Sequence, residues 1–196
     1  MGSKKPTVSV LMPFYDNGTT ENRRLFSEAL KGMLSQNFRG FEVVMAVSGE
    51  KDFARGLAAE DSRIKIYEFD QKISSKKSLP LKEKVYGIIT ARNLCLKKAK
   101  GIFVAYADYD DISFPGRLKK QVGFLKNHPD IGVLGSSMIL EDEKGREVGR
   151  RAAPVTDAEV RRHLLQFNPV PQPTVMATNQ PDERASHSRS ESPRRA

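Results

Sequence analysis

The chain has 196 residues, of which 38% are hydrophobic and 29% are charged, and its net charge is +9. This length suits one domain with its own hydrophobic core. The excess of basic over acidic residues favours phosphorylated small molecules or anionic lipid headgroups as partners. The sequence has no RNA-binding aromatic motif and no zinc-finger spacing, which argues against nucleic acid.

Strands and helices alternate along the chain. Apolar runs predict strands at residues 7–12, 41–47, 64–69, 102–107 and 133–140, and helical patterns predict helices at 21–36 (with Thr20 as N-cap), 85–98, 115–127 and 157–166. This alternation predicts an α/β fold with a mainly parallel sheet and helices on both faces. Such sheets bind ligands at the carboxyl ends of their strands, which points to the loops after Pro13, after Val47 and at Asp108.

Two segments differ from the rest in composition. Residues 71–84 are rich in Lys and Ser and are expected to form a solvated loop. Residues 177–196 contain no aromatic, Val, Ile, Leu or Met side chain, so they cannot offset the entropy of ordering. The expected organisation is therefore one domain at 1–176 and a disordered polar tail at 177–196.

The compartment is predicted from what the chain lacks. Its single cysteine, Cys95, cannot form an internal disulfide, which fits a reducing compartment. The apolar stretch near the N-terminus is broken by Pro13 and has no cleavage site. No apolar run approaches the ~20 residues of a spanning helix. We expect a cytoplasmic protein, at most peripheral at the inner face of a membrane.

The strongest chemical signal is an acidic cluster, Asp108, Asp110 and Asp111, directly after a hydrophobic strand. Neighbouring carboxylates repel one another unless a cation or a basic group neutralises them. Mg²⁺ commonly takes one or two carboxylates together with substrate phosphates. The cluster therefore predicts a divalent metal, Mg²⁺ or Mn²⁺, held against a diphosphate. The alternative is a polar turn that caps the helix near Pro115.

Other candidate residues lie at neighbouring positions. Arg92 falls on the apolar stripe of its helix with Ile88 and Cys95, so its charge needs a partner: a diphosphate, or an Asp in a structural ion pair. Tyr15, in the first strand-end loop, is expected to pack on a base or ribose, or to cap the sheet edge.

Several motifs in order resemble the family 2 glycosyltransferases of GT-A type over residues 6–176. The chain shares VSVLMPFYD at 8–16, ARN at 91–93, AKG at 99–101 and ADYDD at 107–111, followed by Pro115, Arg117, Leu118 and Gln121, then NP at 168–169 and PTVM at 173–176. Each motif alone is weak, whereas their order across most of the chain is specific.

The resemblance implies a GT-A, Rossmann-like fold and a function. It implies metal-dependent, inverting transfer of a sugar from a nucleoside diphosphate, with UDP expected, to a glycan or lipid-linked acceptor in polysaccharide synthesis. It also implies that Asp108 contacts the nucleotide, that Asp110 holds the metal, and that Asp111 faces the donor sugar or orders the loop. The remaining predicted nucleotide-binding residues are Pro13, Tyr15, Asp16, Ser48 and Arg92.

The chain also departs from the family pattern. Val47 and Ser48 stand where members usually carry two acidic residues that read the base, and Gln172 replaces a usual His. The family places its acidic general base beyond residue 176, where only the polar tail follows, so we identify no catalytic base. The sequence predicts a transferase lacking its C-terminal part, or alternatively a non-catalytic nucleotide-sugar-binding module.

A phosphohydrolase of the haloacid dehalogenase type is a third interpretation, because that class also places Asp-x-Asp after a strand. Its pair usually lies near the N-terminus, with Thr or Val two residues after the second Asp. Ile112 occupies that position here, and the pair lies in the middle of the chain.

Overall fold

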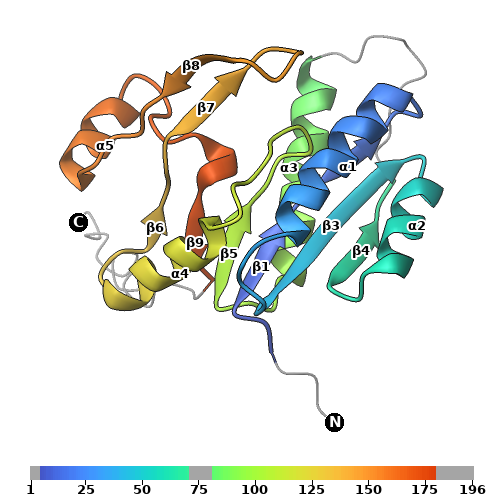
Figure 1. Cartoon of the computed structure of the whole chain (residues 1–196), viewed down its shortest axis with the longest axis horizontal. Helices are drawn as coiled ribbons and strands as arrows, with labels where there is room; N and C mark the ends of the chain where they lie inside the picture. Colours follow the sequence, from blue (N-terminus) through green and yellow to red (C-terminus); the bar gives the residue numbers. More distant parts are fainter. Residues whose placement is uncertain (1–4, 71–80, 180–196) are drawn as a thin grey trace, which may run out of the picture.

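The computed structural model describes residues 5–70 and 81–179, within which a seven-stranded sheet forms the centre of the molecule (Figure 1). Across this sheet the strands are β4 (Ile64–Glu68), β3 (Phe41–Gly49), β1 (Val8–Leu11) continued by β2 (Phe14–Asp16), β5 (Phe103–Tyr106), β9 (Met176–Thr178) and β6 (Val133–Leu134). Strands β1 to β5 pair in parallel, whereas β9 is antiparallel to both of its neighbours. The predicted mainly parallel sheet is confirmed.

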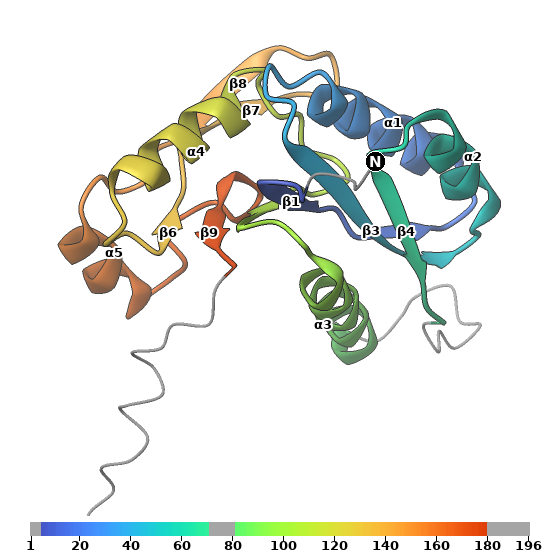
Figure 2. The ribbon, with the colours of Figure 1, turned by 90° about the horizontal axis from the view of Figure 1, so that it is seen from below.

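Helices cover both faces of the sheet. Helices α1 (Thr20–Leu34), α2 (Asp52–Glu60) and α4 (Arg117–Asn127) lie on one face, and α3 (Leu81–Lys98) lies on the other (Figure 2). The buried apolar side chains of α1 and α4 belong to the larger core, together with those of β1 and β3. In the smaller core, Ala91 and Cys95 of α3 pack with Leu11, Val44 and Val104 of the sheet. Burial on both faces explains why β1 and β3 are almost wholly apolar in sequence.

Element boundaries differ from the sequence prediction at several points. The N-cap of α1 is Thr19 rather than Thr20, because the Thr19 side chain accepts a hydrogen bond from the Asn22 N–H. Helix α4 begins at Arg117 rather than Pro115. Residues 81–84, expected in a loop, belong to α3, and the rest of that expected loop, residues 71–80, lies outside the described residues.

The strand expected at 133–140 is two separate strands. Gly135 to Ser137 interrupt it, so β6 joins the main sheet while β7 (Met138–Glu141) pairs with β8 (Glu147–Arg151) in a hairpin. The predicted turn at 143–146 connects this hairpin, with Gly145 at φ 71°. Helix α5 (Asp157–Leu164) follows and begins with a capping box formed by Thr156 and Glu159.

The end of the described chain belongs to the sheet. Residues 176–178 form β9, and the Asn179 side-chain amide donates a 2.9 Å hydrogen bond to the Gly101 carbonyl. The domain boundary expected at residue 176 therefore falls inside a strand, and residues 177–179 are ordered rather than part of a disordered tail. Residues 180–196 lie outside the described residues. None of the helices in the described ranges has both the length and the apolar character needed to cross a membrane.

Candidate functional site

A cavity of about 480 Å³ lies at the carboxyl ends of the central strands, against the middle of α3. Its walls come from β2, the end of β3, the residue after β4, α3 and the loop after β5. This is the position at which open parallel sheets bind ligands. The cavity brings together six of the predicted site residues: Pro13, Tyr15, Ser48, Arg92, Asp108 and Asp110.

Strand β2 places Tyr15 beside Ser48 on the cavity wall. The two residues are paired in the β2–β3 register, and strand alternation buries Phe14 and Asp16 while leaving Tyr15 40% exposed. The Phe14 ring stacks on Phe26 of α1 with centroids 3.9 Å apart, which anchors the strand from behind. An exposed aromatic ring next to a hydroxyl is suited to contact a planar, polar group.

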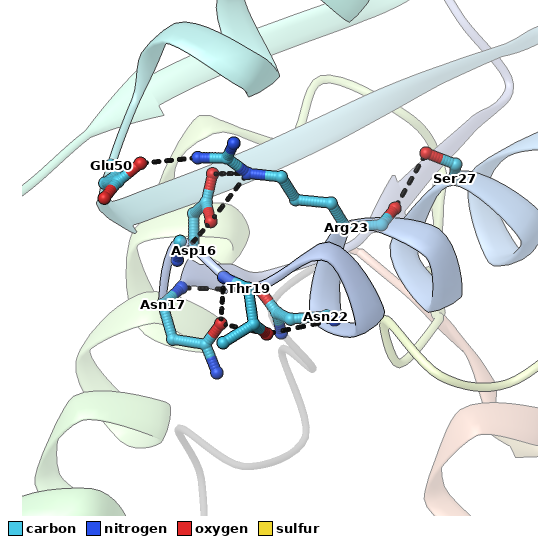
Figure 3. Close-up of polar contacts among 8 residues, drawn as sticks. Asp16, Asn17, Thr19, Asn22, Arg23, Ser27 and Glu50 are labelled. Atoms are coloured by element: carbon cyan, nitrogen blue, oxygen red, sulfur yellow. Dashed lines mark hydrogen bonds and ion pairs between the residues drawn. The ribbon is translucent and has the colours of Figure 1, made fainter. Parts of the chain in front are cut away.

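Asp16 does not line this cavity, and its polar contacts are shown in Figure 3. Its side chain is fully buried, where it accepts a 2.8 Å hydrogen bond from the Gly18 N–H and pairs with Nε of Arg23 at 3.0 Å. Arg23 also bridges to Glu50, whose backbone N–H donates to the Asp16 carbonyl. Gly49 is required at this contact, because a Cβ there would lie 2.1 Å from the Asp16 carbonyl oxygen. Asp16 thus holds the β2 and β3 ends together.

Arg92 of α3 and Asp108 of the loop after β5 form an ion pair at the cavity. Nη2 of Arg92 donates to Oδ1 of Asp108 at 2.9 Å, and the two side chains are 23% and 27% exposed. The ion pair expected as one of two partners for Arg92 is therefore present, and both residues also line the cavity. Within the described residues, Nε of Arg92 is buried and makes no hydrogen bond.

The acidic loop accumulates unfavourable negative charge. Burial raises the pKa of Asp110 above its usual range, and the neighbouring Asp108 carboxylate adds to this effect. Burial also raises the pKa of Asp111 to about 6, with Asp110 and Asp108 adding to the shift and Arg117 opposing it. A cation bound next to this loop would relieve the repulsion and favour the ionised carboxylates.

The oxygen ligands of the loop fit a hard divalent cation, although the part of the chain that the structure describes offers no complete set of metal ligands. Among the described residues, no three Asp, Glu, His or Cys side chains are grouped to hold one ion. Asp110 lines the cavity, Asp108 is engaged with Arg92, and Asp111 does not reach the cavity wall. A metal here would need oxygens from a ligand, which is how Mg²⁺ is commonly held beside phosphates.

Several lining residues were not predicted from the sequence. Phe69, Ile88, Ala91 and Tyr109 supply much of the apolar wall. Ile88 lies one helical turn before Arg92 on the predicted stripe, but it is 49% exposed because it faces the cavity rather than the core. The spacing of Ile88 from Arg92 was the sequence feature that could have indicated its place in the cavity wall. For Phe69 the only such feature was its position at the end of a strand.

A family model described as glycosyl transferase family 2 matches residues 9–179. The chain belongs to glycosyltransferase family 2. The resemblance carried by the sequence motifs is thus confirmed.

Several proteins in this group are similar to the chain over most of its length. EpsE of Bacillus subtilis (strain 168) is 32% identical over 181 residues, which are 90% of this chain and 53% of EpsE. The amylovoran biosynthesis glycosyltransferase AmsE of Erwinia amylovora is 27% identical and matches 82% of this chain and 56% of its own length. The UDP-Glc:alpha-D-GlcNAc-diphosphoundecaprenol beta-1,3-glucosyltransferase WfgD of Escherichia coli is 27% identical, with 75% and 51% covered. The chain spans about half the length of these relatives.

Solved structures share the fold. S. aureus TarS 1-349 aligns with a TM-score of 0.56 and 21% identity, covering 88% of this chain and 47% of that chain. The same protein in complex with UDP-GlcNAc aligns with a TM-score of 0.55 and 21% identity, covering 88% and 45%. The predicted GT-A architecture is confirmed by this likeness.

Proposed function

We propose that this chain provides the donor site of a glycosyltransferase that moves a sugar from a nucleoside diphosphate, UDP in our assignment, to an acceptor hydroxyl. The observation that carries the proposal is that one cavity is lined both by Tyr15 and Ser48 and by Arg92, Asp108 and Asp110. The aromatic ring of Tyr15 and the hydroxyl of Ser48 are suited to the base and ribose of a nucleotide. The guanidinium and the two carboxylates are suited to its metal-bound diphosphate. The fold shared with TarS, which is solved with UDP-GlcNAc and with UDP, supports this assignment.

The residues divide by the part of the donor that each would contact. Pro13, Tyr15 and Ser48 would contact the base and ribose, and Ser48 offers one hydroxyl that either donates or accepts a hydrogen bond. Arg92 and Asp108 would contact the nucleotide near its phosphates. Asp16 would support the site from behind, through the Arg23 pair described above.

Asp110 would hold a Mg²⁺ or Mn²⁺ ion together with diphosphate oxygens, and Asp111 would order the loop or face the donor sugar. A bound divalent ion supplies positive charge that stabilises the departing nucleoside diphosphate. The chain's own contribution is to place Asp110 in the cavity lining while Arg92 holds Asp108 in an ion pair beside it. By family membership we assign inversion at the anomeric carbon.

Polysaccharide synthesis is the process we assign to the longer protein. AmsE is named for amylovoran biosynthesis, and WfgD is named for a diphosphoundecaprenol acceptor. We extend this class of acceptor, a glycan or a lipid-linked glycan, to this chain, with peripheral placement at the cytoplasmic face of a membrane. The excess of basic residues in the chain is suited to such a surface.

A second candidate is donor binding without turnover. Among the described residues, the carboxylates that line the cavity are Asp108 and Asp110, of which the first is paired with Arg92 and the second is the proposed metal ligand. Inverting transfer needs a further base to deprotonate the acceptor hydroxyl. The lining of this cavity therefore supports donor binding more strongly than catalysis by this chain alone.

Thermal unfolding with nucleoside diphosphates, with and without Mn²⁺, tests the proposal. UDP at 100 times its dissociation constant should add about 2.7 kcal/mol, or roughly 5–10 °C in a domain of this size. The shift should require Mn²⁺ and vanish in Asp110→Ala, while Asp130→Ala, at an exposed position, should retain it. A shift that is independent of Asp110, or no shift with any nucleotide, would refute the donor site. Release of sugar from the donor would then separate turnover from binding.

A further inference from the structure

Arg117, the first residue of α4, makes hydrogen bonds to the acidic loop, to the segment before β9 and to its own helix. Its Nη2 donates to the carbonyl of Tyr106 at 2.8 Å, and its Nη1 donates to the hydroxyl of Ser113 at 3.0 Å. Nη2 also lies 3.3 Å from the carbonyl of Val175, and Nε donates to Gln121 one turn along the helix. Arg117 has no salt-bridge partner within the described residues.

The two nearest of these contacts lie at the ends of the acidic loop. Tyr106 is the last residue of β5 and precedes Asp108 by two positions, and Ser113 follows Asp111 by two positions. One planar guanidinium thus joins both ends of the loop that carries the acidic cluster. The guanidinium holds its donors in a rigid planar fork, which fixes the positions of two acceptors relative to each other, whereas the three donors of an ammonium group rotate at the end of a flexible stem.

The third contact connects the loop to the last strand. The Val175 carbonyl also accepts from the Tyr106 N–H, and Gln121 donates to the neighbouring Thr174 carbonyl at 2.7 Å. The segment entering β9 is therefore held to the start of α4 by two side chains of that helix. Burial lowers the pKa of Arg117 to about 10, with Asp111 and Asp108 opposing the shift, so the group stays cationic at neutral pH next to the carboxylates.

We propose that Arg117 is a positioning residue: by clamping Tyr106 and Ser113 it sets the geometry in which Asp110 and its neighbours hold a divalent ion and the donor diphosphate. This inference rests on the proposed function, because it assigns to Arg117 the placement of that same loop. The clamp acts through geometry and not through charge alone, which separates it from a general electrostatic effect.

Mn²⁺ affinity in the presence of UDP tests the proposal, measured by the electron paramagnetic resonance signal of free Mn²⁺. Arg117→Gln should weaken Mn²⁺ binding by about 10- to 100-fold, the usual effect of removing a group that orients metal ligands. Arg117→Lys should fail to restore the affinity, because it keeps the charge and loses the fork. Ser113→Ala, which removes one acceptor, should weaken binding by a smaller factor.

Arg63→Gln is the matched control. Arg63 is also a partly buried arginine, but it pairs with Asp61 and donates to the Leu34 carbonyl, and neither of these partners belongs to the acidic loop. It should lower the unfolding midpoint and leave the Mn²⁺ affinity of the folded protein unchanged. If Arg117→Gln does not fold, Ser113→Ala and Arg117→Lys decide the question. Unchanged affinity in these variants, or full recovery in Arg117→Lys, would overturn the clamp. Failure of the wild-type chain to bind Mn²⁺ with UDP would instead overturn the donor site, and the inference with it.

Discussion

The Arg92 guanidinium is 2.9 Å from the Asp108 carboxylate, and this pair joins α3 to the loop after β5 on one wall of the cavity. A hydrogen bond to a charged group contributes about 1.5–3 kcal/mol, so Arg92→Met should weaken UDP binding by roughly 10- to 100-fold. Isothermal titration calorimetry with UDP and Mn²⁺ measures this, with the exposed Arg39→Met as control. Wild-type affinity in Arg92→Met would exclude Arg92 from the donor site.

Asp111 predicts a specific pH dependence of stability. Its pKa is raised to about 6 in the folded protein, so the folded state binds the proton more tightly than the unfolded state does. The resulting destabilisation is absent below the unfolded pKa of about 3.9 and is complete above pH 6. Asp111→Asn should therefore raise the unfolding midpoint of the metal-free protein at pH 7.5, by about 2–4 °C after allowance for solvent screening.

That gain should shrink as the pH is lowered from 6 towards 4, because the wild-type carboxyl then becomes neutral as well. Differential scanning calorimetry across this range, without metal and with Asp130→Asn as the exposed comparison, measures the effect. A gain that is equal at every pH would show that the Asp111 charge is not its origin.

Asp16 is predicted to act on stability and not through direct contact with the donor. Asp16→Ala removes the fully buried partner of Arg23 and should cost about 1.5–3 kcal/mol, or roughly 5–10 °C in midpoint. Arg23→Met should give a similar loss, since it breaks the same pair. In both variants UDP affinity, measured well below the midpoint, should stay within about threefold of wild type. Loss of affinity without loss of stability in Asp16→Ala would place this carboxylate on the nucleotide.

Ser48 tests the recognition of the base. Its hydroxyl lies on the cavity wall at the position where the family usually has an acidic residue. Ser48→Ala should weaken UDP binding by roughly threefold to tenfold, the range for one neutral hydrogen bond of about 0.5–1.5 kcal/mol. The unfolding midpoint should remain within about 1 °C of wild type, as it should in Ser62→Ala, an exposed serine. Equal affinities in both variants would remove Ser48 from the base contact.

The predictable parts of the fold are the strands that are buried on both faces of the sheet, because this burial produces a run of apolar residues in the sequence. Strands β1, β3 and β5 are mostly apolar because helices cover both sides of them. Helix α2 was missed because it is short and buries only Ala54. Strand β9 was missed because its three residues follow a proline-rich segment, and their extended form depends on the open edge of β5 rather than on a local pattern.

The site divides in the same way. The position of Asp108 and Asp110 was predictable because residues directly after a parallel strand lie at the carboxyl edge of the sheet, and an Asp in an ion pair was one of the two partners expected for Arg92 because a charge on an apolar stripe needs one. The environment of Asp16 was not predictable, since the pair with Arg23 depends on how α1 returns over the end of β2. The contacts of Arg117 were equally hidden, because they join residues that are up to 58 positions apart in the chain.

The pairing of β9 with β5 also bears on how the molecule is made. Ala105 pairs with Met176, so the outer edge of β5 stays bare until roughly 70 further residues have left the ribosome. Contacts between segments so distant in sequence form slowly. Until they form, the unpaired strand edge can pair with other chains and promote aggregation. Since Arg117 ties the acidic loop to Val175 at the entry of that strand, the loop is completed only at this stage. The emerging chain, rather than the finished protein, is therefore the form most in need of protection by chaperones.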